Sequence, residues 1–300
     1  MAEQQEAAGQ PQAEQQRADA RGNGVEGQAE LLSLASQYRS EFESTFDGLR
    51  RRSQELQQSV HQHIETGGAE LLPQKDAALA IIQDTSDVAA PSQLVLQSYL
   101  WSAILVASFG TASLLGTFLF SPLVTLLLGT YGLAAVAIVG IPTLGLFYLK
   151  QLHISGASDP EVRMNLVVLS ILNGVAFGSL VSHRWLFAEP VACVYPLIIA
   201  LAYAPAQKSL GSSRVHVLGA LVGSALFSSL MLGLFTSSVC GPYLFHAVLL
   251  SAVSVLSLQF FFKTVQTEND VPVTHLHQLA YLFGVILAKS LSYGLISHEY

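Results

Sequence analysis

The chain has 300 residues, of which 51% are hydrophobic and only 12% are charged, and its net charge is −7. Residues 1–93 carry 15 acidic and 7 basic side chains, whereas residues 94–300 carry only 6 and 7. A soluble domain has charge on about a quarter of its residues, so the small number of charges in residues 94–300 excludes a soluble fold for that region. The net negative charge of the chain argues against binding to nucleic acid.

The N-terminal third divides into three predicted segments. Residues 1–30 are rich in Gln, Glu, Ala and Gly, which predicts disorder, and they contain no apolar core of a cleavable signal peptide. Residues 31–65 repeat apolar side chains at three- and four-residue steps and therefore predict an amphipathic helix; these side chains are Leu34, Tyr38, Phe42, Phe46, Leu49, Leu56, Val60 and Ile64. This helix could be solvated, dock on a protein partner or lie in the membrane plane. Residues 66–93 read as a linker.

Residues 94–300 predict an all-α bundle of six to seven transmembrane helices. A spanning helix needs about 20 mostly apolar residues, and such runs lie at 96–119, 122–149, 165–183, 185–206, 215–237, 241–262 and 276–296. The runs are continuously apolar rather than alternating, which argues against a β-barrel. The seventh run contains His277, Gln278 and Lys289, so it could be a full span, a shallow segment or a re-entrant one.

The distribution of basic residues predicts the orientation of the bundle. If the N-terminus is cytosolic, the cytosolic loops contain five basic residues, whereas the loops on the other side contain only Arg184. The five are Lys150, Arg163, Lys208, Arg214 and Lys263. Cytoplasmic loops collect Lys and Arg. We therefore expect a multi-pass integral membrane protein with a cytosolic N-terminus.

Two pairs of glycines at four-residue spacing predict close helix packing. They are Gly174 with Gly178, and Gly219 with Gly223. Small residues at this spacing let the backbones of neighbouring membrane helices approach.

No enzyme motif is visible, so we expect no catalytic site, no cofactor and no metal site. The close pair His275 and His277 would lie on different faces of a helix. Ionisable residues inside a membrane are costly and are the functional candidates. Glu189 lies just inside the fourth run or at the interface, Lys263 closes the sixth run, and Lys289 needs a partner if the seventh run spans. Glu161 and Arg163 flank the start of the third run and are expected to pair locally.

Three segments make the chain from about residue 88 onward similar to the Bax inhibitor (transmembrane Bax-inhibitor-motif, TMBIM) family. They are PSQLVLQSYLWSAILVASFGTASLLG, EVRMNLVVLSILNGVAFGSLV with its Gly-x-x-x-Gly, and SSRVHVLGALVGSALFSSLMLGLF. The resemblance implies six helices around a central seventh, residence in the endoplasmic reticulum, calcium leak, and regulation of cell death.

The resemblance also implies a pair of buried aspartates that gate calcium in the last two helices. Here these positions fall on Lys263, after Phe262, and near Phe283, between Leu282 and Gly284, so neither is acidic. The candidate pore or gating residues are then Glu189, Lys263, Phe283, Lys289 and Arg163. The leading hypothesis is a calcium or cation leak channel or a regulator of cell death and stress. The alternatives are a non-conducting scaffold that anchors helix 31–65 for a protein partner, or a small-molecule transporter.

Overall fold

The computed structural model describes residues 76, 78–87, 90–267 and 271–299. The predicted disordered segment 1–30 and the predicted amphipathic helix 31–65 lie outside these residues. Residues 77–300 form one compact unit, and its description follows.

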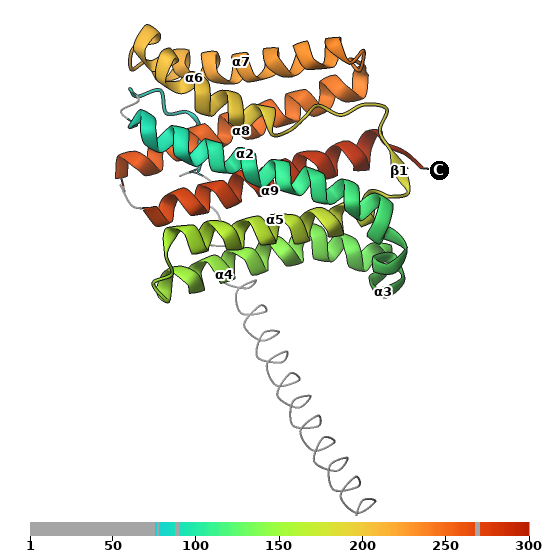
Figure 1. Cartoon of the computed structure of the whole chain (residues 1–300). Helices are drawn as coiled ribbons and strands as arrows, with labels where there is room; N and C mark the ends of the chain where they lie inside the picture. The colour runs from blue at the N-terminus through green and yellow to red at the C-terminus, as the bar shows by residue number, and fades with distance from the viewer. Residues whose placement is uncertain (1–75, 77, 88–89, 268–270, 300) are drawn as a thin grey trace, which may run out of the picture. The chain divides into compact units, whose positions relative to one another are not determined.

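The first apolar stretch of this unit is a long, bent helical segment. It runs through α2 (Ser92–Leu115), a π-helical turn η1 (Gly116–Phe120), α3 (Ser121–Ala134), a second π-helical turn η2 (Ala135–Gly140) and α4 (Ile141–Ile154). Gly129 interrupts α3 with φ 64° and ψ 168°, a conformation that glycine adopts at little steric cost. The predicted span 122–149 is therefore not one continuous helix. The chain turns back around α3 (Figure 1).

Five further helices complete the bundle, and 84% of the described residues are helical. They are α5 (Asp159–Val181), α6 (Val194–Leu210), α7 (Arg214–Phe235), α8 (Gly241–Thr267) and α9 (Val271–Ile296). The only described strands are β1 (Arg184–Trp185) and β2 (His298–Glu299), which pair antiparallel. The all-α prediction is confirmed. Helix α6 begins later than the predicted span 185–206, because β1 and Pro190, which has no backbone donor, precede it.

Among the described residues, five helical stretches are long and apolar enough to cross a membrane. They are Ser92–Ile154, Asp159–Val181, Arg214–Phe235, Gly241–Val265 and Thr274–Ile296. The last contains the ambiguous seventh run, which is one continuous helix. Large apolar side chains face outward, with Tyr131 93% and Leu126 83% exposed. A soluble monomer rarely exposes apolar surface this extensively.

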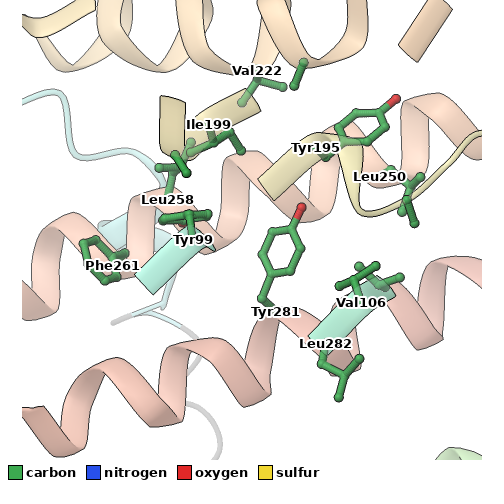
Figure 2. Packing of buried hydrophobic residues seen from close by; sticks show 14 of the residues in the cluster. Tyr99, Val106, Tyr195, Ile199, Val222, Leu250, Leu258, Phe261, Tyr281 and Leu282 are labelled. Carbon is green, nitrogen blue, oxygen red and sulfur yellow. The ribbon is translucent and has the colours of Figure 1, made fainter. Parts of the chain in front are cut away.

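The centre of the core is built from aromatic side chains of α2, α8 and α9. Tyr99 meets Phe261 and Tyr281 edge to face, with ring centroids 5.7 and 5.9 Å apart (Figure 2). The buried hydroxyls have partners, since Tyr99 bonds Ser257 at 3.1 Å and Tyr281 bonds Ser254 at 3.0 Å. Helix α9 also contacts α4 and α5, and α2 contacts both α5 and α6, so these two helices join the two sides of the bundle.

The order of the helices sorts the basic residues between two ends of the bundle. Helices α4, α6 and α8 end where α5, α7, α9 and α2 begin (Figure 1). This end holds the five residues expected in the inner loops, and we call it the basic end: Lys150, Arg163, Lys208, Arg214 and Lys263. Arg184 and the C-terminal strand lie at the opposite end.

Candidate functional site

Glu189 and Lys289, 100 residues apart in the chain, form a partly buried ion pair. Lys289 Nζ lies 2.6 Å from Glu189 Oε2, and the two side chains are 13% and 23% exposed. Glu189 comes from the segment between β1 and α6, and Lys289 from the last third of α9. Burial raises the pKa of the Glu189 carboxyl, but the Lys289 ammonium more than offsets this, so the pKa lies below its usual value. The structure thus gives each charge its counter-ion.

Two side chains that the sequence did not single out extend this pair into a polar cluster. His246 of α8 is fully buried, and both of its ring nitrogens lack a hydrogen-bond partner. It lies near enough to interact electrostatically with Glu189 and Lys289. The Tyr293 hydroxyl also stabilises the ionised Glu189 carboxylate. A lone histidine in an apolar run gives no signal of this position, because its neighbours come from other helices.

Arg163 belongs to a second polar cluster, at the basic end. Its guanidinium lies 2.9 Å from Asp159 and 5.0 Å from the Trp101 ring. Arg163 was expected to pair with Glu161, but it pairs with Asp159 instead. Residues two apart, such as Glu161 and Arg163, face different sides of a helix, whereas residues four apart, such as Asp159 and Arg163, are neighbours. Asp159 also accepts a hydrogen bond from His275 Nε2 at 2.9 Å, so its carboxylate is shared.

Lys263 lies at a third cluster, which fixes the segment before α2. Arg214 is fully buried and its Nη1 lies 2.8 Å from Asp84 Oδ2, whereas the half-exposed Lys263 lies 3.9 Å from the same oxygen. Hydrogen bonds from Ser86, together with the Arg214 charge, lower the pKa of Asp84 to about 2. The Tyr203 hydroxyl donates to the Ala90 carbonyl at 3.0 Å. The part of the predicted linker 66–93 that the structure describes is therefore tied to the bundle.

The two glycine pairs behave differently. A Cβ at Gly174 or Gly178 would overlap the backbone of α2 at Phe109 and Ser113, so α5 and α2 pack closely there. A Cβ at Gly219 or Gly223 would meet nothing within 4 Å. The close packing expected at this second pair is not found in the described part of the chain, because this face of α7 is turned outward.

The five candidate pore residues do not share one place. Glu189 and Lys289 form one cluster, whereas Arg163 and Lys263 lie at the basic end in two others. Phe283 is partly buried and packs against apolar core residues. The ion pairs join helices to each other and to the segment before α2.

These observations define an all-α protein with several helices long and apolar enough to cross a membrane, held together by ion pairs between distant segments. The chain belongs to the family described as "Interactor of ZYG-11", whose family model matches residues 1–299. No curated protein and no solved structure matches the chain.

The family match overturns the resemblance to the Bax inhibitor family. The leak-channel and cell-death hypotheses that depended on it are wrong for this chain. The segments that suggested the resemblance consist of apolar and small residues, a composition that unrelated membrane-type helices share. The acidic pair that would have been distinctive is replaced by Lys263 and Phe283.

Proposed function

We propose that this chain is a multi-pass membrane protein whose function is to bind a ZYG-11 protein. The observation that carries the proposal is the family match, which spans residues 1–299 and includes the N-terminal third as well as the bundle. The family's description is that of an interacting protein, which favours a binding role over catalysis. The absence of any enzyme motif from the sequence supports the same choice.

The proposed docking element is the predicted amphipathic helix 31–65. Its apolar stripe includes Phe42 and Phe46, and aromatic side chains on one face of a helix are typical anchors for a partner's groove. The Asp84–Arg214 ion pair ties the described residues 78–87 to the bundle.

The proposed orientation puts the basic end and the N-terminus in the cytosol. Five basic residues gather at this end, and Arg184 lies at the other, as the rule for cytoplasmic loops requires. The endoplasmic reticulum was implied by the Bax inhibitor resemblance alone, and it is not part of the proposal. Protease protection in sealed vesicles tests the orientation: cleavage within residues 1–75 from the cytosolic side supports it, and protection there contradicts it.

The binding proposal is tested with the full chain, purified in detergent, and an immobilised ZYG-11 protein. We expect saturable binding that survives physiological salt. In the double variant Phe42→Asp/Phe46→Asp, affinity should fall by at least about thirtyfold, since loss of even one anchor residue costs about 2 kcal/mol. The matched control Ser40→Asp/Ser44→Asp adds the same charges to the opposite face of the predicted helix and should bind normally.

The outcomes separate the two parts of the proposal. Absence of binding by the folded full chain would overturn the proposed function. Binding that is equal in both double variants would keep the function but transfer the docking surface from helix 31–65 to another part of the chain.

A further inference from the structure

A polar pocket lies at the basic end, where three helices begin together. Its volume is about 260 Å³, and each helix supplies polar side chains to its lining: Gln97 and Ser98 from α2, Asp159 and Arg163 from α5, and Thr274 and Gln278 from α9. Helices α2, α5 and α9 start at Ser92, Asp159 and Val271. All three therefore turn their N-terminal ends towards this region, as Figure 1 shows.

Gln278 is the residue that makes this pocket unusual. Its side chain is only 1% exposed, and neither its amide nitrogen nor its amide oxygen has a hydrogen-bond partner. Arg163 Nε is buried and unpartnered as well. Buried polar groups are almost always hydrogen-bonded, and each exception calls for a reason. Two donors and one acceptor from different helices are thus available to a group that enters the pocket.

The charge around the pocket favours an anion over a cation. The Asp159 carboxylate already accepts from Arg163 and from His275, at 2.9 Å each, which leaves it little capacity to hold a cation. The Gln97 amide also faces Arg163, and with its oxygen turned towards the guanidinium it accepts from Nη2 at 2.8 Å. The N-terminus of a helix carries about half a positive charge from its free amide groups, and such ends bind phosphate.

We propose that this pocket binds a phosphate-type oxyanion, either the headgroup of a membrane lipid or a soluble phosphate. The proposal does not depend on the binding of a ZYG-11 protein. The position of Trp101, with its ring 5.0 Å below the Arg163 guanidinium, favours the lipid as the source. Tryptophan is enriched at the level of lipid headgroups, and Trp101 lies deeper along α2 than Gln97 and Ser98, on the side from which a lipid would enter.

The test uses the purified full chain in detergent and two probes, dioctanoyl phosphatidic acid and inorganic phosphate. Binding is followed by calorimetry and by the rise in thermal unfolding temperature. We expect Gln278→Leu to weaken binding of phosphatidic acid by about tenfold or more, because a hydrogen bond to a charged group is lost. Gln278→Met removes the same amide with an unbranched side chain and should give the same loss if the leucine variant folds poorly.

Asn173 supplies the matched control. It is fully buried in α5, both of its amide atoms also lack partners, and it does not line this pocket. Asn173→Leu should therefore change stability without weakening binding of the probe. Binding of both probes, lost in the Gln278 variants, shows that the phosphate group suffices, and binding of phosphatidic acid alone identifies the lipid. Binding of neither probe, or equal binding by wild type and both Gln278 variants, would overturn the proposal.

Discussion

Replacement of Lys289 by methionine is the sharpest test of how the bundle tolerates its internal charges. The Nζ atom lies 2.6 Å from Glu189 Oε2, and both groups are largely withdrawn from water. In Lys289→Met the stem of the side chain keeps its packing, and only the ammonium is lost. Glu189 is then left partly buried without its counter-ion, next to a histidine, His246, whose ring nitrogens have no partner.

The expected magnitude follows from the distance and the burial. At an effective dielectric constant of about 20, two unit charges 2.6 Å apart attract by about 6 kcal/mol. The cost of removing both charges from water offsets much of this attraction, yet removal of one partner alone typically destabilises a protein by about 3–5 kcal/mol. Because both side chains keep some exposure, we expect about 3 kcal/mol for Lys289→Met.

The double variant Lys289→Met/Glu189→Gln distinguishes the stabilising effect of the ion pair from the effect of each side chain alone. Without the carboxylate there is no uncompensated charge, so most of the lost stability should return. The assay is reversible thermal or chemical unfolding in one detergent, with His246→Phe as a control that removes an unpaired buried polar group nearby. If the double variant is as unstable as the sum of the two single variants, the ion pair is not what stabilises this region, and the reasoning fails.

Three further predictions concern helix packing and the segment before α2. Gly178→Ala should lower the unfolding temperature by an amount that corresponds to about 1–3 kcal/mol, because its Cβ overlaps the backbone of α2, whereas Gly223→Ala should not; equal effects would contradict the packing. Arg214→Met should raise amide hydrogen exchange in residues 78–87 while the centre of α7 stays protected, because the tie to Asp84 is lost; unchanged exchange would show that other contacts hold this segment. Because the pKa of Asp84 is lowered to about 2, its stabilising effect should be complete above its ordinary pKa of 3.8 and disappear as the pH falls towards 2; exchange in residues 78–87 measured against pH would show this loss, and Asp84→Asn should abolish the dependence.

Helix positions could be predicted because the membrane-type helix has a strong one-dimensional signal. An apolar run of about 20 residues needs no information from the rest of the chain, so five of the seven runs appear as helices close to their predicted ranges, and 185–206 appears as the shorter, later α6. The run 122–149 is the one that the structure breaks internally. Gly129 looks there like any other glycine in an apolar segment, and only its positive φ reveals the reversal.

The candidate site could be predicted only one residue at a time. Glu189 and Lys289 each stood out as a charge in an apolar context, but a single sequence holds no signal that joins positions 100 residues apart. His246 and Gln278 were harder still, since their significance is that their polar atoms lack partners. That property belongs to the packing of several helices and not to any local pattern.

The pairing of charges bears on where the partner binds. In the described part of residues 94–300, Arg163, Arg214 and Lys289 are each committed to an acidic side chain of the same chain. A partner that competed for Arg214 or Lys289 would have to break a contact between distant segments, at a cost of several kcal/mol per pair. An apolar stripe such as that predicted over residues 31–65 carries no such penalty. For this reason the variants that abolish partner binding should differ from those that destabilise the bundle, and a variant set chosen from Phe42, Phe46, Gly178 and Lys289 can establish whether the two groups are separate.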